Sequence, residues 1–395
     1  MTRRLYWENP LLFEFEAQII AHSTWRGAPS VVLDATAFYP EAGGQMPDHG
    51  ELANRRVLDV QLDEGGTIHH LLEGEPPDVG ARVQGSVNAR RRREHMALHT
   101  GQHMLSHAML DAAGAKTVSS RLGERVSTLD VDVADLSADA IAEALAAVNA
   151  IIDEDRPVRA SFPAADVLAS LPLRRTPKVK HDVRVVDIEG FDVTPCGGTH
   201  ATHTSQVGGI HVLGHARHKG GTRLTFLTGP RLRRLLCERA SSLDGLAARF
   251  TCAPEDVPRA VANLDAEWKQ ARAELGAARG TLAGLTADAL AADASDARVA
   301  AHLDGDMDQA RAISRKLVDQ QLTVLLATGT GERLRVLASR PEGDGPDLGH
   351  FLRETAGTLG GAAGGRPHHA EGRIPRDAFP KLREHFLRCI SWGRS

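Results

Sequence analysis

The chain has 395 residues, 42% of them hydrophobic and 25% charged, and a formal net charge of −4 at pH 7. This length predicts several domains, and the acidic balance excludes a protein coated throughout with nucleic acid, although local basic clusters can bind phosphates. A disulfide framework and a membrane helix are also excluded, because the four cysteines are scattered and no run approaches about 18 apolar residues. We therefore expect a soluble, cytoplasmic protein. The cysteines are Cys196, Cys237, Cys252 and Cys389.

The first segment, residues 1–88, is predicted to be rich in β-strands. Short runs such as FEFEAQII, SVVLDATAF and VLDVQL are bounded by Gly, Pro and Asp, which is typical of a small barrel or sandwich, and we favour the barrel. The stretch FYPEAGGQMPDHGEL interrupts these runs, and its Pro and Gly residues predict a glycine-rich loop.

The second segment, residues 89–230, has mixed periodicity. Apolar residues at helical spacings predict a helix from Ala89 to about Ala113, which Gly114 ends. A second helix is expected after Ser137 as its N-cap, and extended stretches such as VRVVDIEG and TRLTFLTG follow. The segment is therefore predicted to be an α+β domain.

The rest of the chain divides into a helical segment and a smaller domain. Residues 231–292 have apolar positions at the spacing of an antiparallel helical hairpin or short coiled coil. Residues 293–395 are predicted to form a separate α/β domain of helices and strands, with a Gly-rich loop before the last helix. The predicted fold class is thus α+β.

A metal site is the chemistry that the second segment suggests most directly. His95, His99, His103 and His107 recur every fourth residue, so a helix places them near one face, and adjacent members could share an ion. Far along the chain, TPCGGTHATH supplies Cys196 with either His200 or His203 across two glycines that permit a tight turn. One thiolate and three imidazoles form a closed tetrahedral set for Zn²⁺. Spacing alone does not choose among the histidines.

Four motifs together resemble a known family. HTGQHMLSHAM and CGGTHATHTSQVGGI, with LDATAFYPEAGGQMPDHGEL before them and TRLTFLTGPR after them, are similar to the editing domain of alanyl-tRNA synthetase and to the free-standing AlaX proteins. The motifs occur in the family's order. The resemblance implies that His99, His103, Cys196 and His200 are the zinc ligands.

The C-terminal domain extends the resemblance. The predicted hairpin followed by GTLGGAAGGRPHHAEG resembles the DHHA1-type C-terminal domain of alanyl-tRNA synthetase, although Glu371 and Arg373 depart from the family's loop. The whole chain therefore resembles the long AlaX form. This likeness implies contact of the domain with tRNA or a homodimer formed through it.

The resemblance implies an ATP-independent ester hydrolase that removes a wrong amino acid from tRNA(Ala) during protein biosynthesis. The expected substrates are Ser-tRNA(Ala) and Gly-tRNA(Ala), because a synthetase pocket that accepts Ala cannot strongly reject either amino acid. Thr36 and Gln45 are candidates to bind the Ser hydroxyl, and Gln102 occupies the position before the second helical histidine. Gly43 and Gly44 could offer backbone N–H groups to an oxyanion. No general base is assigned.

Basic clusters surround the proposed pocket and predict a track for tRNA phosphates. The candidate residues are Arg90, Arg91, Arg92, Arg93, Arg223 and Arg366. Two other functions fit the same motifs: an editing enzyme with threonyl-tRNA-type specificity, and a tRNA-binding module in which zinc is structural and no hydrolysis occurs.

Overall fold

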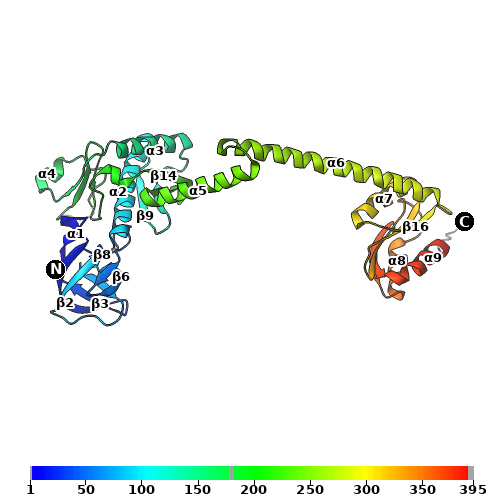
Figure 1. Cartoon of the computed structure of the whole chain (residues 1–395), viewed down its shortest axis with the longest axis horizontal. Helices are drawn as coiled ribbons and strands as arrows, with labels where there is room; N and C mark the ends of the chain where they lie inside the picture. The colour runs from blue at the N-terminus through cyan, green and yellow to red at the C-terminus, as the bar shows by residue number, and fades with distance from the viewer. Residues whose placement is uncertain (1, 178, 180, 390–395) are drawn as a thin grey trace. The chain divides into compact units, whose positions relative to one another are not determined.

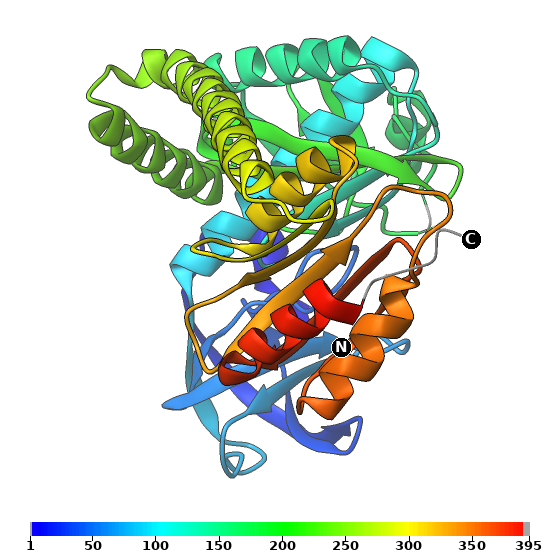
Figure 2. The same cartoon turned by 90° about the vertical axis from the view of Figure 1, so that its right-hand side faces the viewer.

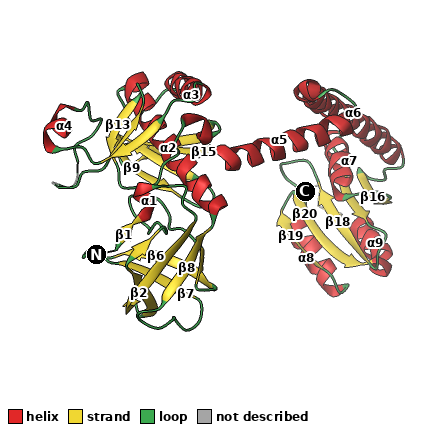
Figure 3. Cartoon of the chain, turned by 60° about the vertical axis from the view of Figure 1, so that its left-hand side comes forward, coloured by secondary structure: helices red, strands yellow, loops and turns green. Residues whose placement is uncertain are grey.

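The computed structural model describes residues 2–177, 179 and 181–389. The chain divides into two units, Met1–Gly245 and Leu246–Ser395. Both units contain helices and strands, which confirms the mixed α+β class (Figure 3). The expected division into four segments is finer than these two units and stays a prediction. Within the described residues, no helix combines the length and apolar character that crossing a membrane requires.

Six strands near the N-terminus close into a barrel in the order β2-β3-β7-β6-β5-β8 (Figure 1). In β2, the buried residues Phe15, Ala17 and Ile19 alternate with exposed ones, as expected of a strand with one face on a core. The bounds are β2 Glu14–Trp25, β3 Ala28–Leu33, β5 Gly50–Leu52, β6 Arg55–Leu62, β7 Ile68–Leu72 and β8 Arg82–Val87. The short strand β1 (Arg3–Arg4) and the helix α1 (Leu5–Glu8) precede the barrel strands in the sequence. β1 pairs in parallel with β4 (Ala35–Thr36), which follows β3.

The long helix α2 (Ala89–Ala113) runs through the interior of the first unit. It begins after Asn88, whose side chain accepts a hydrogen bond from the backbone N–H of Arg91. It ends, as predicted, at Gly114, which adopts a φ of +62°. Every residue from position 95 to position 106 is buried, so the polar side chains of this stretch lie where partners must come from the protein or a bound ligand.

Two sheets and a second helix complete the first unit. A four-stranded sheet has the order β14-β15-β10-β9, and a three-stranded antiparallel sheet has the order β11-β12-β13. α3 (Ala138–Asp153) begins at the predicted N-cap Ser137 and packs with α2 and the sheets into one core. The other bounds are β9 Thr117–Leu122, β10 Ser127–Val131, β11 Val158–Ser161, α4 Ala165–Ser170, β12 Val185–Ile188, β13 Asp192–Pro195, η1 Thr204–Val207, β14 Ile210–His218, β15 Gly221–Thr228 and α5 Gly229–Phe250.

The second unit contains a five-stranded sheet in the order β16-β17-β18-β20-β19, covered on both faces. Leu325 in β17 packs on one face against α8 and α9, and Leu326 packs on the other against α6 and α7. The ribbon of this unit, in yellow to red, shows its helices beside the strands (Figure 2). The bounds are η2 Pro254–Asp256, α6 Val257–Ala292, β16 Arg298–Leu303, α7 Met307–Asp319, β17 Thr323–Thr328, β18 Arg333–Ser339, α8 Leu348–Thr358, β19 Ala362–Arg366, β20 His369–Pro375, η3 Arg376–Ala378 and α9 Phe379–Cys389.

One expectation about this unit is wrong. The Gly-rich stretch predicted as a loop forms β19, which pairs antiparallel with β20. The glycines allow close packing: a Cβ on Gly365 would lie 2.3 Å from the His369 carbonyl oxygen, and one on Gly349 of α8 would lie 2.7 Å from the Gly365 oxygen. The predicted helical hairpin corresponds to α5 and α6. Because α5 crosses the division between the units, the pairing of these helices stays a prediction.

Candidate metal centre and cleft

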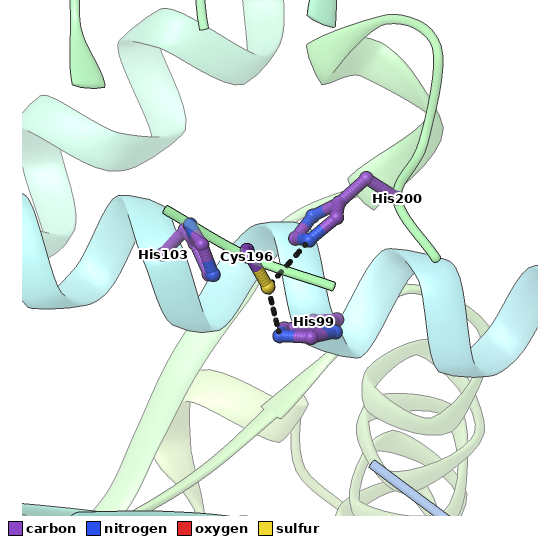
Figure 4. Close-up of side chains that lie close together, drawn as sticks. All are labelled: His99, His103, Cys196 and His200. Carbon is purple, nitrogen blue, oxygen red and sulfur yellow. Dashed lines mark hydrogen bonds between the residues drawn. The ribbon is translucent and has the colours of Figure 1, made fainter. Parts of the chain in front are cut away.

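Four side chains from two distant segments meet inside the first unit. His99 and His103 project from α2, and Cys196 and His200 come from the turn after β13 (Figure 4). Each offers one ligand atom, and these four atoms lie within 4.8 Å of one another. The Cys196 sulfur is 3.4 Å from Nε2 of His99 and 3.3 Å from Nε2 of His200. The structure thus brings together the four residues that the resemblance implied.

One glycine of the turn, Gly198, serves close packing rather than an unusual backbone conformation. Neither Gly197 nor Gly198 has a positive φ, so the turn that they were expected to permit does not use the left-handed backbone region. A Cβ on Gly198 would instead lie 2.2 Å from Cε1 of His99, so a larger residue would displace that ring. Arg184 secures the turn by donating through Nη1 to the carbonyl oxygens of Cys196 and Gly198, both at 2.9 Å.

Two of the histidines are oriented by hydrogen bonds at Nδ1. Oε1 of Gln45 accepts a hydrogen bond from the backbone N–H of Thr199, which identifies this atom as the amide oxygen. Nδ1 of His99, 2.8 Å from the same oxygen, therefore carries the proton and donates to it. Nδ1 of His200 lies 3.2 Å from the hydroxyl of Thr100, which already accepts from a backbone N–H. With the proton at Nδ1, the lone pair of Nε2 faces the sulfur.

The third histidine faces a carboxylate that sequence reasoning missed. Asp192 lies four residues before Cys196, and its Oδ2 is 3.6 Å from Nδ1 of His103. Arg174 donates to the same carboxylate at 2.7 and 3.2 Å, and Thr194 donates to it as well. Burial raises the pKa of Asp192, but His103 and the other donors outweigh burial and hold it far below its ordinary value. The carboxylate is therefore charged and placed to orient His103.

The charge of the cluster fits a metal ion. Burial raises the pKa of the Cys196 thiol, but the surrounding histidines outweigh burial and hold it well below its ordinary value. Burial lowers the pKa of His99 and His200. Burial also lowers the pKa of His103, but the thiolate and Asp192 outweigh burial and raise this pKa above its ordinary value. A thiolate with three imidazole nitrogens directed at it is a donor set for a cation such as Zn²⁺.

The competing histidines lie outside the cluster. His95 is buried, and neither of its ring nitrogens has a hydrogen-bond partner among the described residues. His107 lies beside Asp192, 3.5 Å from its Oδ1, and His203 is exposed. None of the three offers an atom to the group of four.

A cleft of about 1390 Å³ opens beside His99, His103 and Cys196. Gly43 and Gly44 line it, as does Gln102, which donates to the Ser106 hydroxyl at 2.7 Å. Gly44 has a φ of +84°, a backbone conformation that favours glycine. A Cβ there would also lie 2.6 Å from the Ser120 oxygen, so both the backbone and the packing require glycine at this position.

The two residues expected to bind a substrate hydroxyl do not line the cleft. Thr36 is fully buried, and its hydroxyl is 2.9 Å from Nε2 of His70. Gln45 is also fully buried, and its amide bonds to His99 and Thr199. Their role in binding substrate stays a prediction, in which the substrate would compete with these partners.

One predicted tRNA contact is wrong. Arg92 is fully buried, forms an ion pair with Asp48, and donates to the carbonyl oxygens of Pro10 and Ala37. A guanidinium enclosed in this way cannot reach a phosphate in solution. The basic run therefore does not lie on a single exposed face, because successive helical residues are 100° apart.

The other predicted arginines keep an exposed surface to different extents. Arg90, Arg93 and Arg366 are exposed. Arg91 is half-buried, and its Nε donates to a carbonyl oxygen at 2.9 Å. Arg223 is also half-buried and is paired with a carboxylate at 2.6 Å. Contacts of these residues with tRNA stay predictions.

Comparisons with known proteins agree with this architecture. Residues 183–225 match the family described as "Threonyl and Alanyl tRNA synthetase second additional domain". The chain is 30% identical to the alanyl-tRNA editing protein AlaX-L of Pyrococcus horikoshii, over 98% of this chain and 99% of that protein. It is 31% identical to the alanine–tRNA ligase of Thermococcus kodakarensis over 94% of this chain, but it spans only 42% of that ligase.

A solved structure, the C-Ala domain of the Aquifex aeolicus alanyl-tRNA synthetase, matches 24% of this chain and 91% of that domain. The sequence identity is 19% and the TM-score 0.23, a similarity too low to assign a fold.

Proposed function

The chain belongs to the family of alanyl-tRNA editing proteins, and we propose that it is an aminoacyl-tRNA deacylase that hydrolyses mischarged tRNA(Ala), chiefly Ser-tRNA(Ala) and also Gly-tRNA(Ala). The observation that carries the proposal is the convergence of one cysteine and three histidines beside a cleft. A second site of this kind is needed because binding alone discriminates poorly against one added hydroxyl or one missing methyl group.

We propose that the bound metal is zinc, held by Nε2 of the three histidines and by Sγ of Cys196. When bound, zinc would supply positive charge that can polarise an ester carbonyl or lower the pKa of a water. Gln45, Thr100 and Asp192 would fix the ring orientations, so that the ligand atoms are arranged before the ion arrives.

The residues that line the cleft supply binding and orientation. Gln102 lies one residue before His103, and its amide oxygen, which has no hydrogen-bond partner within the described part of the chain, is a candidate acceptor for the hydroxyl of a seryl group. The backbone N–H groups of Gly43 and Gly44 are candidates to stabilise negative charge on the ester oxygen. An ester is more reactive than an amide, so positioning of this kind can supply much of the acceleration.

The test is a deacylation panel with the full-length protein. Ser-, Gly- and Ala-charged tRNA(Ala) and Ser-charged tRNA(Thr) are incubated with the wild type, with His103→Ala and with the control His203→Ala, which removes an exposed histidine near the same turn. We expect hydrolysis of Ser-tRNA(Ala) by the wild type and the control, slower hydrolysis of Gly-tRNA(Ala), and none by His103→Ala.

Each other outcome of the panel contradicts a stated part of the proposal. Preferential hydrolysis of Ser-tRNA(Thr) would replace the proposed specificity with the threonyl type. Binding of tRNA without hydrolysis of any substrate would make the protein a passive carrier. Wild-type activity in both histidine variants would show that the metal centre is not needed for the reaction.

We also propose that the second unit forms a homodimer through α6. With Ala271 and Ala278 included, apolar residues on this helix recur at alternating spacings of three and four, as in a coiled coil, and the six large ones in this series are exposed. These six are Val261, Leu264, Trp268, Leu275, Leu282 and Leu285. An apolar stripe of this length is rarely left in water.

The solution mass of the full chain tests the homodimer. We expect a dimer for the wild type and for the control Leu58→Glu, which alters an exposed leucine of the barrel. We expect a monomer for the double variant Leu264→Glu/Leu275→Glu. A monomeric wild type would show that another part of the same chain covers the stripe.

A further inference from the structure

A second cavity of about 850 Å³ lies against a different face of α2 from the metal cleft. Its lining includes Arg93 and Ala97 of this helix, whereas the metal cleft is lined by His99 and His103. The two cavities share no lining residue, and the helical rotation of 100° per residue directs these two sets of side chains away from each other. The volume lies in the range of ligand sites.

The floor of this cavity is apolar and its rim is basic. Met96, Ala97 and Ala201 line it and are buried. The described cationic residues of the lining are Arg90, Arg93, Arg233 and Arg234, from the start of α2 and the start of α5. The structure thus places hydrophobic surface and positive charge around one opening.

The acidic residue in this lining does not cancel the charge. Glu94 already accepts from Arg231 and Arg234, each at 3.3 Å, and lies 3.4 Å from Arg90. The guanidinium of Arg93 lies over the Phe13 ring, 4.8 Å from its centroid, and no carboxylate pairs with it within the described part of the chain. Arg93 therefore keeps its hydrogen-bond donors for a ligand.

Arg233 has room for its guanidinium beside a glycine. Gly208 has a φ of +65°, and a Cβ there would lie 2.8 Å from Nη1 of Arg233, so a side chain at position 208 would displace the guanidinium. Arg233 is exposed and also lacks a carboxylate partner among the described residues. Two guanidinium groups on one rim, both without a carboxylate partner across the residues that the structure describes, favour an anion with several oxygens.

We propose that this cavity, defined by Arg93, Arg233 and the apolar floor, binds an RNA strand, with phosphates on the two arginines and a sugar or base face on the floor. Phosphate oxygens match the planar guanidinium fork, and the chain as a whole, at −4, would otherwise repel RNA. Ala201 directly follows the ligand His200, so RNA held here would lie close to the metal centre.

The proposal rests on the proposed function only in identifying the RNA as tRNA. It is therefore tested with uncharged tRNA(Ala), so that failure of hydrolysis and failure of this cavity are distinguishable. The test variant is Arg93→Gln/Arg233→Gln. The matched control is Arg56→Gln/Arg82→Gln, which removes the same charge from exposed positions on the barrel. Zinc content of each protein checks that the first unit is folded.

At about 0.1 M salt we expect the test variant to bind tRNA at least about tenfold more weakly than the wild type, and the control to stay within about threefold. The slope of log Kd against log salt should fall by about 1.5 in the test variant, as expected for two lost phosphate contacts. Equal affinities and slopes in the two double variants would overturn the proposal, because general charge would then explain the binding.

Discussion

The barrel and the metal centre each bury histidines, and the two regions use them in opposite ways. In the barrel, His70 is fully buried with Nδ1 3.2 Å from the Val31 carbonyl oxygen and Nε2 2.9 Å from the Thr36 hydroxyl. Both ring nitrogens have partners from the same region. Nothing remains for a metal ion, and the ring connects two parts of the barrel.

In the metal centre, the ring of His99 is held by an amide at Nδ1 and turns Nε2 toward the other candidate ligands. Nδ1 bonds to Gln45, and Nε2 points to the sulfur of Cys196. His200 has the same arrangement, with Thr100 at Nδ1. A buried histidine therefore indicates a metal site only when one nitrogen is fixed by the protein and the other converges with further donors.

The largest expected effect comes from removing the sulfur. Cys196→Ala should weaken zinc binding by about 4 kcal/mol, near a thousandfold, which is about a quarter of the binding free energy of a structural zinc site with four ligands. Competition with a chromophoric chelator measures the affinity. If the variant binds zinc with the wild-type affinity, Cys196 is not a zinc ligand.

The barrel histidine should change stability without changing the metal. Burial lowers the pKa of His70 to about 4. Below pH 6.5 the unfolded chain binds a proton that the folded barrel refuses, so the free energy of unfolding falls as pH falls from about 6.5 to about 4, by about 3 kcal/mol from this group.

The variant His70→Gln should lose this part of the pH dependence and keep its zinc. Urea unfolding of wild type and variant at several pH values measures the difference. An identical pH dependence in the two proteins would show that His70 is not held neutral by burial.

Asp192 should have a smaller effect on the metal. Asp192→Asn keeps an oxygen acceptor for His103 but removes the charge, and we expect zinc affinity to fall about 10- to 100-fold. The control is Asp130→Asn, which alters a carboxylate paired with Arg223 elsewhere in the unit and should leave zinc affinity unchanged. Equal losses in both variants would mean that the effect is on folding.

The smallest effect is expected at Thr100. Thr100→Val removes the hydroxyl beside Nδ1 of His200 with little change in shape. We expect zinc affinity to fall about fivefold, in keeping with about 1 kcal/mol for one neutral hydrogen bond. Chelator competition measures it, and a loss larger than that of Asp192→Asn would reverse the order of importance assigned to these partners.

The sequence predicts much of the site because the ligands form local patterns. His99 and His103 share a helical face, and Cys196 lies beside His200 in a glycine turn. The periodicity leaves the histidine pair open, since each four-residue step turns the helix by only about 40°. The family resemblance was needed to choose among them.

The partners of the ligands could not be predicted in the same way. Asp192 and Gln45 reach their histidines only through the tertiary fold, and their positions in the sequence give no periodic signal. The burial of Arg92 within a run of four arginines has the same cause, because its partner Asp48 lies in a distant loop. Glycines can likewise indicate a loop or a closely packed strand, as at Gly365 in β19.

X-ray absorption at the zinc edge, combined with metal analysis of the purified full-length chain, tests the central claim most directly. We predict one zinc ion per chain, bound by one sulfur at about 2.3 Å and three nitrogens at about 2.0–2.1 Å. The sulfur signal should be absent in Cys196→Ala. A wild-type protein that holds no stoichiometric zinc, or zinc without a sulfur ligand, would contradict the account.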